Sequence, residues 1–168
     1  MAYALQADRK IVAAQLSSLA ITLIAMLTVM AILWRSVKLA AISLGISLVP
    51  LAVLAMLAAG FAVPLNSVTA MIAALVLGIS IDDAVHLVTH WLQLRKQGVE
   101  PAAALAESLD AKGPAILCTS LILIGFSIAL VWMSFPPVQH FGWLSAAAYG
   151  AALMAVLWAL PAFLATRK

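Results

Sequence analysis

Charge is scarce in this sequence. Only 9% of its 168 residues are Asp, Glu, Lys or Arg, whereas soluble domains usually contain about 25%. Hydrophobic residues make up 66% of the chain, and its mean hydropathy is +1.17. A soluble fold of this length has too little interior to bury so much apolar surface. The composition therefore predicts an integral membrane protein. At about 20 residues per span, the length fits five spans and leaves no room for a soluble catalytic domain.

Cysteine is also nearly absent. The single cysteine, Cys118, lies inside an apolar run, which excludes a disulfide framework and a cysteine-based metal site. The sequence lacks a nucleophile–base pair, a phosphate-binding loop and a set of metal ligands, so we expect neither an enzyme nor a bound cofactor. The net charge is +3, but the few basic residues lie at the edges of apolar runs. That placement indicates membrane topology and not a nucleic-acid partner.

Alternation of polar and apolar residues is missing as well, and the apolar runs are long. The predicted fold class is therefore all-α integral membrane. A single transmembrane domain is expected to cover residues 1–168, with spans at about 11–34, 39–61, 68–91, 115–135 and 141–164.

The long polar segment between the third and fourth spans predicts a short cytoplasmic amphipathic helix at about 101–111. Pro101 favours the start of a helix, and Gly113-Pro114 favours its end. One face of this helix is apolar and is expected to lie at the membrane surface. That face consists of Ala102, Leu105, Ala106 and Leu109.

Two features of the spans predict packing. Pro50 lies inside the second span and predicts a kink there. Gly142, Ala146 and Gly150 form a stripe of small residues on the fifth span, which predicts a close contact with another helix.

The basic residues predict the orientation. With five spans, the first loop, the third loop and the C-terminal tail share one side and hold seven basic residues, whereas the other side holds two. This bias places the C-terminus in the cytoplasm and the N-terminus outside. An outside N-terminus without a leader also leads us to expect further protein upstream. The seven are Arg35, Lys38, Arg95, Lys96, Lys112, Arg167 and Lys168; the two are Arg9 and Lys10.

The third span carries an acidic pair, Asp82 and Asp83, near its centre at Ser80. A carboxylate at that depth costs about 2.5–3.5 kcal/mol on insertion scales. Intramembrane acids usually face the interior of a helix bundle and serve ion or proton pathways. The structural alternative is a carboxyl group that burial keeps neutral and that bonds to a neighbouring hydroxyl.

Helical spacing arranges the neighbours of the acids. Gly78, Asp82 and His86 recur every four residues and share one stripe. Gly78 is expected to let another helix approach closely. Asp83 lies about a quarter turn further round, and two carboxyl groups this close would titrate as a coupled pair. His86 extends a proton relay or is an interfacial histidine; both interpretations stay open.

Other polar residues in the spans carry weaker predictions. Asp82, His86 and His90 form a ladder along one helix, but residues so spaced rarely converge on one metal ion, so no metal site is predicted. Hydroxyl groups on the fourth span are candidate partners of the acids, although such groups more often bond to carbonyls of their own helix. These are Thr119, Ser120 and Ser127.

The stretch from Gly78 through Asp82-Asp83 to His86 resembles the G-x-x-x-D-D signature of the resistance–nodulation–division superfamily. It is most similar to the hydrophobe-exporter, or MMPL, branch and its sterol-sensing, Patched-like relatives. The resemblance extends over nearly the whole chain. It includes Gly113-Pro114, Thr119-Ser120, Gly125-Phe126, Ser134-Phe135, Phe141-Gly142 and Leu160-Pro161-Ala162.

The resemblance implies a fold and a site. The chain resembles the five-helix membrane block of one half of such a transporter, and the second half more than the first. The family's proton-carrying acid maps onto Asp82. Many exporters have tyrosine at the next position, where this chain has Asp83 like the Patched-like relatives, which leaves the partner of Asp82 open. The exterior domains that select substrate and the opposing half are not in the sequence.

The leading hypothesis is therefore part of the membrane domain of a proton-driven exporter of lipids or other hydrophobic molecules, in the bacterial inner membrane. Its expected partners are membrane lipid, the hydrophobic substrate and the other half of the transporter, on the same or a separate chain, or further copies of this chain. One alternative is a non-transporting module of the sterol-sensing kind that binds lipid or assists assembly. Another is an inactive, truncated transporter.

Overall fold

The structure is a computed structural model, and it describes residues 2–61, 63 and 67–166. Helices make up most of this part of the chain, which contains no β-strand. The all-α fold class is therefore confirmed. The elements are α1 (Ala2–Trp34), α2 (Val37–Ser47), α3 (Val49–Gly60), α4 (Ser67–Lys96), α5 (Pro101–Val131), α6 (Pro136–Met154), the π-helix η1 (Ala155–Ala159) and α7 (Leu160–Ala165).

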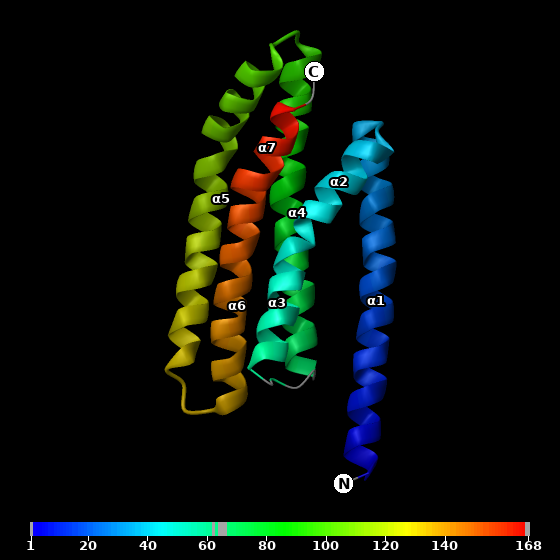
Figure 1. Cartoon of the computed structure of the whole chain (residues 1–168), viewed down its shortest axis with the longest axis vertical. Helices are drawn as coiled ribbons and strands as arrows, with labels where there is room; N and C mark the ends of the chain where they lie inside the picture. Colours follow the sequence, from blue (N-terminus) through cyan, green and yellow to red (C-terminus); the bar gives the residue numbers. More distant parts are fainter. Residues whose placement is uncertain (1, 62, 64–66, 167–168) are drawn as a thin grey trace.

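Five helical stretches in the described residues are long and apolar enough to cross a membrane, as predicted. They run side by side along the long axis of the molecule, and α6 lies between α5 and α3 in Figure 1. The first helix, α1, stands at one edge, and its N-terminal end extends beyond the other helices (Figure 1). The stretches are Ser17–Trp34, Val37–Gly60, Thr69–Lys96, Pro101–Val131 and Pro136–Ala165.

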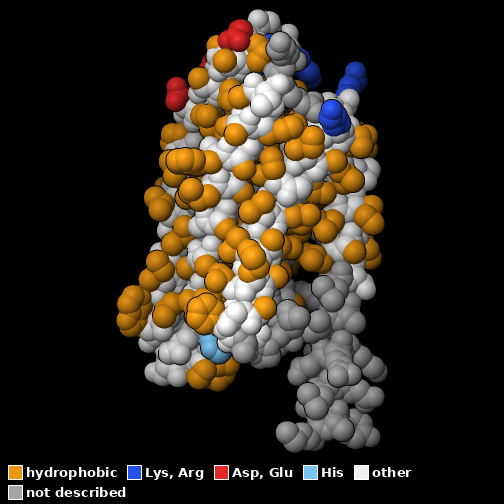
Figure 2. All heavy atoms as spheres, viewed as in Figure 1, with side chains coloured by type: hydrophobic (Ala, Val, Ile, Leu, Met, Phe, Trp, Pro, Cys, Tyr) orange, Lys and Arg blue, Asp and Glu red, His pale blue; other side chains and the backbone are white. Residues whose placement is uncertain are grey.

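One end of the bundle collects the charged residues. The turn between α1 and α2, the connection between α4 and α5 and the end of α7 all lie there (Figure 1). Figure 2 shows lysine, arginine, aspartate and glutamate side chains gathered at this end, and an apolar surface below it. The predicted grouping of the first and third loops with the C-terminal end is thus confirmed. The predicted contributions of Arg9, Lys10, Arg167 and Lys168 lie outside the residues whose side chains are described.

Polar contacts connect the helices and turns at this charged end. The side chain of Ser36 accepts a hydrogen bond from the N–H of Leu39 and caps α2, which satisfies one of the free N–H groups of a helix start. The indole N–H of Trp34 donates to Oγ1 of Thr89 at 3.0 Å and joins the end of α1 to α4. The Arg95 guanidinium donates to the Val99 carbonyl at 2.9 Å and holds the turn after α4.

The second and fifth spans are irregular. The second span is divided at Leu48 into α2 and α3, and Pro50 follows the division. Because proline has no N–H, it cannot donate to the carbonyl four residues earlier, and the helix changes direction there. The predicted kink at Pro50 is confirmed. The fifth span contains the π-helix η1 just before Pro161, and a π-turn is one way for a helix to accommodate the missing N–H.

The amphipathic helix predicted at 101–111 does not end at Gly113-Pro114. It continues into the fourth span as the single helix α5, with Pro114 inside it. A proline removes one hydrogen bond from a helix, and neighbouring helices can compensate for that loss in a transmembrane helix. On the face expected at the membrane surface, Ala102 and Ala106 are exposed, whereas Leu105 packs inward. The side that packs inward contains Ala104, Leu105 and Ser108.

Gly142 of α6 lies in close contact with the backbone of α5. A Cβ atom added to Gly142 would lie 2.6 Å from the backbone oxygen of Ser127 and 3.0 Å from the backbone nitrogen of Val131. Since both are backbone atoms, they cannot move aside as a side chain does. The small-residue stripe predicted for this span is therefore confirmed at Gly142, whereas Gly150 has open space around it.

The first prediction concerns this contact. The Gly142→Ala substitution should lower the free energy of unfolding by about 1–3 kcal/mol, the usual cost of overpacking. It is measured by unfolding the purified protein in mixed detergent micelles. The matched control is Gly150→Ala on the same helix, which should leave stability unchanged or slightly raised because alanine favours the helix. Equal effects of the two substitutions would show that α5 and α6 do not pack this closely.

Candidate functional site

The acidic pair lies at the midpoint of the candidate span Thr69–Lys96, on α4. The two carboxyl groups point in different directions because consecutive residues of a helix are rotated by about 100°. Asp83 is 8% exposed and lies inside the bundle. The side chain of Asp82 is 71% exposed and is left uncovered by this chain. The two acids therefore occupy two different environments.

Asp82 belongs to an uncovered stripe on α4. Gly78, Asp82 and His86 are all exposed, and Nε2 of His86 lies 3.5 Å from Oδ1 of Asp82. The predicted stripe is thus confirmed. A Cβ atom on Gly78 would meet nothing within 4 Å, so no helix in the described part of the chain uses the close approach that Gly78 permits.

One expectation about the acids is only half right. Intramembrane acids were expected to face the bundle interior, and Asp83 does. Asp82 instead faces outward, together with His86. A pattern of residues along one helix tells which side chains share a face, but not which face the neighbouring helices cover.

His90 does not extend the stripe. Its Nδ1 lies 3.1 Å from the hydroxyl of Ser108 on α5, and Ser108 in turn donates to the Ala104 carbonyl at 2.7 Å. His90 therefore belongs to the contact between α4 and α5, away from Asp82. Within the described part of the chain, no three His, Cys, Asp or Glu side chains come together in a way that would hold a metal ion.

Thr119 and Ser127 are two of the α5 hydroxyl groups that were considered as partners of the acids, and both have other surroundings. Thr119 lies 3.1 Å from the carbonyls of both Ala115 and Ile116 and bonds to its own helix. Ser127 is buried where α5 packs against Gly142. The expectation that such hydroxyls satisfy their own helix is confirmed for Thr119.

Serines of the second span, which the sequence did not single out, approach α4 instead. Ser43 and Ser47 of α2 are fully buried, as is Ser80 of α4. The Ser47 hydroxyl lies 3.3 Å from the backbone oxygen of Ser80, one turn from Asp83. A signal was present, since serines at i and i+4 in an apolar span mark a polar line along one helix face.

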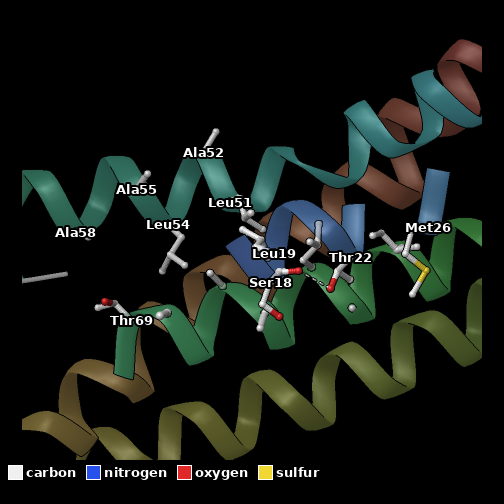
Figure 3. A pocket seen from close by; sticks show the side chains of 16 residues that line it. Ser18, Leu19, Thr22, Met26, Leu51, Ala52, Leu54, Ala55, Ala58 and Thr69 are labelled. Atoms are coloured by element: carbon white, nitrogen blue, oxygen red, sulfur yellow. Dashed lines mark hydrogen bonds between the residues drawn. The ribbon is translucent and has the colours of Figure 1, made fainter. Parts of the chain in front are cut away.

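An apolar groove lies beside the acidic stripe. Its volume is about 450 Å³, within the range of ligand pockets. It lies between α1, α3 and α4, and Figure 3 shows Leu54 of α3 directed toward α4, with Ser18, Thr22 and Met26 contributed by α1. Small residues form much of the wall. They are Ala52, Ala55, Ala58, Ala70, Ala73, Ala74 and Gly78.

The polar groups in this groove are few. The Thr22 hydroxyl donates to the Ser18 carbonyl at 2.9 Å, so it is satisfied within α1. Gly78 belongs both to the groove and to the stripe of Asp82. The groove therefore begins one helical turn from the carboxyl group. The sequence did not predict it, because the separation of α1 from α3 and α4 cannot be read from a single helix.

The second prediction concerns the two environments. In a Cys118→Ala background, Asp82→Cys should react with a water-soluble maleimide in detergent solution at least about ten times faster than Asp83→Cys. The physical reason is that thiol modification requires access to the sulfur. Gly78→Cys on the same stripe is the matched control and should react like Asp82→Cys. Equal rates at positions 82 and 83 would contradict the placement of Asp83 inside the bundle.

Comparison with known proteins agrees with this architecture. The model of the MMPL family matches residues 3–167. A membrane protein of Methanocaldococcus jannaschii is 28% identical over 102 residues, which are 61% of this chain and 26% of that protein. The chain thus matches about a quarter of the length of this relative. No solved structure gave a significant match. With five candidate spans in the described part and a family match over nearly its whole length, the chain belongs to the MMPL family.

Proposed function

We propose that this chain is part of the membrane domain of a proton-driven exporter of lipids or other hydrophobic molecules. The observation that carries the proposal is the placement of Asp82, a carboxyl group at the midpoint of a span, on a face that this chain leaves uncovered. In the proposal, Asp82 and Asp83 take up and release the proton, and His86 extends the path toward the cytoplasmic end.

The energetic argument starts from the cost of the acid. A carboxylate at the centre of a bilayer costs about 2.5–3.5 kcal/mol on insertion scales, and nothing in the packing of α4 requires one. A charge that crosses the membrane potential gains about 2.3 kcal/mol per 100 mV. An acid that binds a proton from one side and releases it to the other can convert this energy into a change of conformation.

The uncovered stripe indicates the partner. A face with Asp82 and His86 cannot rest against lipid without the cost just given, whereas a protein surface can supply hydrogen bonds. Gly78 leaves room on this face for close contact with another helix. We therefore propose that the other half of the transporter covers this stripe. That half is a further segment of the same protein, a separate chain or a second copy of this block.

The groove supports a hydrophobic substrate. It is lined almost entirely by apolar side chains, and it lies on the membrane-spanning part of the bundle between α1, α3 and α4. An acyl chain or another apolar group of a lipid fits such a lining, because no polar group of the ligand would lose its hydrogen bonds there. The position of Gly78 in both groove and stripe places the proposed ligand one turn from the proposed proton site.

The same groove also favours a second function. A lipid-binding module of the sterol-sensing kind would keep the groove and need no titrating acid. The two functions differ in what they require of Asp82, so a substitution at this position separates them.

We also propose the orientation of the chain, in the bacterial inner membrane. The end of the bundle with the turn between α1 and α2 and the connection between α4 and α5 faces the cytoplasm, in line with the usual excess of basic residues on that side. Arg35, Lys38, Arg95 and Lys96 belong to these two connections and the helix ends beside them. Thr69, which lines the groove near the start of α4, then lies toward the outer side of the membrane.

The third prediction tests the proton site. In the transporter that contains this chain, reconstituted in vesicles with an imposed pH gradient, Asp82→Asn should abolish lipid extraction and the accompanying proton flux, since asparagine cannot bind and release a proton. Asp110→Asn is the matched control and should leave transport unchanged, because Asp110 lies on α5, outside the central part of its span. Proton-driven transport at the wild-type rate in Asp82→Asn would overturn the proposal, and lipid binding without any dependence on the acid would favour the second function.

The fourth prediction tests the groove. Ala74→Phe should reduce photo-crosslinking of a diazirine-labelled phospholipid to the chain in vesicles by several fold, because the ring fills part of the groove that Ala74 lines. The labelling that unlabelled lipid competes away is the quantity to compare. Ala129→Phe is the control, since Ala129 is exposed on α5 and does not line the groove. Unchanged specific labelling in Ala74→Phe would show that the groove does not hold lipid.

A further inference from the structure

The second span is broken directly beside the acidic helix. The helix α2 ends at Ser47, α3 begins at Val49, and Pro50 removes a hydrogen bond across the division. Polar backbone at membrane depth is tolerated where protein buries it. In transporters, such discontinuous spans form sites for substrates and coupling ions. The break therefore makes the contact between α2 and α4 a candidate place for such a site.

A buried line of polar side chains lies at this contact. Ser43 and Ser47 of α2 and Ser80 of α4 are fully buried, and Asp83 is 8% exposed. The Ser47 hydroxyl lies 3.1 Å from the Ser43 carbonyl on its own helix and 3.3 Å from the Ser80 carbonyl on α4. One hydroxyl has one hydrogen, so Ser47 donates to only one of these two carbonyls at a time.

Three oxygens in this line have no hydrogen-bond partner: Oγ of Ser43, Oγ of Ser80 and Oδ2 of Asp83. An unpaired buried polar group is destabilising, so three of them on neighbouring turns of α2 and α4 call for an explanation.

The register of the two helices sets these groups at neighbouring levels. The helices α2 and α4 run in opposite directions, and Ser47 meets Ser80. One turn further toward the charged end lie Ser43 on α2 and Asp83 on α4. Ser80 lies three residues before Asp83 and therefore on a neighbouring part of the same helix face.

We propose that Ser43, Ser80 and Asp83 form an internal proton site between α2 and α4, in which the two serines are positioning residues for the Asp83 carboxyl group. This inference rests on the proposed proton-driven function and adds residues of α2 to it. In the reaction, the Asp83 carboxylate binds one proton and becomes a neutral carboxyl group, and no other bond forms or breaks. A serine hydroxyl suits both states, because it donates to the carboxylate and accepts from the protonated acid.

The charges around Asp83 leave this role to the serines. The charged groups that act on Asp83 are Asp82 and His86, both on α4 itself. The described side chains of α1, α3 and η1 include no titratable group. On the other elements packed against α4, the titratable groups of the described part are Lys38 on α2, Glu107, Asp110, Lys112 and Cys118 on α5, and His140 and Tyr149 on α6. None of these described groups is among the charged groups that act on Asp83.

The experiment follows the carboxyl C=O band of the purified chain in lipid vesicles by pH-difference infrared spectroscopy. Asp83→Asn should remove one titrating band, and Asp82→Asn should leave it. Ser43→Ala and Ser80→Ala should each move its midpoint upward by about one pH unit, a tenfold change in proton affinity, because in the proposed site each hydroxyl turns to donate to the carboxylate, and alanine cannot. The matched control is Ser145→Ala on α6, which also removes a fully buried, unpartnered hydroxyl and should leave the midpoint in place.

The outcomes separate this inference from the proposed function. A band that Asp83→Asn removes but that neither serine variant shifts would overturn the role of the serines alone. A band removed by Asp82→Asn and retained in Asp83→Asn would place the proton on the outward acid and overturn the internal site. A wild-type chain in which neither Asp82 nor Asp83 accounts for a titrating carboxyl band would contradict both proposals. Circular dichroism of each variant verifies that the helices are intact.

Discussion

Hydrocarbon offers no hydrogen bonds, and the structure of this chain depends on that constraint. Most polar groups in its spans are satisfied locally: Thr22 and Thr28 donate to carbonyls one turn back in α1, and Thr119 does the same in α5. The polar groups that are not satisfied in this way are therefore informative. Apart from Ser145 of α6, the buried groups without a partner in the described part of the chain lie on α4 and on the part of α2 that packs against it. On α4, Asp82 lies uncovered and Asp83 lies buried.

The adjacency of the two acids in sequence separates them in space. A rotation of about 100° between neighbouring residues of a helix turns one carboxyl group inward and the other outward. One helix thus packs against α2 on one side and has an uncovered face on another, which a partner covers in the proposed transporter. A single acid could not do both. This gives a physical reason for an aspartate at position 83, and in the proposed mechanism it makes α4 the link between the two halves.

The features that sequence predicts well here are those that depend on composition and on residues close along the chain. Scarcity of charge predicts the spans, Pro50 predicts the break in the second span, and Gly142 predicts the close contact of α5 with α6. The predictions fail where distant packing decides. Gly113-Pro114 does not end a helix, because α5 continues through both residues into the fourth span. The outward direction of Asp82 and the groove beside α1 depend on where other helices lie, which no local pattern contains.

The position of Gly78 suggests how the groove and the acid would act on each other. It lines the groove, and it precedes Asp82 by one turn on the same stripe. A helix transmits movement along its axis as a nearly rigid body, because its packed surroundings have few intermediate arrangements. A rotation or shift of α4 that follows protonation of an acid would therefore change the wall of the groove at Gly78 and Ile81 as well. By reciprocity, a ligand that fills the groove and favours one position of α4 must change the proton affinity of the acids to the same extent. Proton and lipid need no direct contact in this arrangement, since one helix carries both sites.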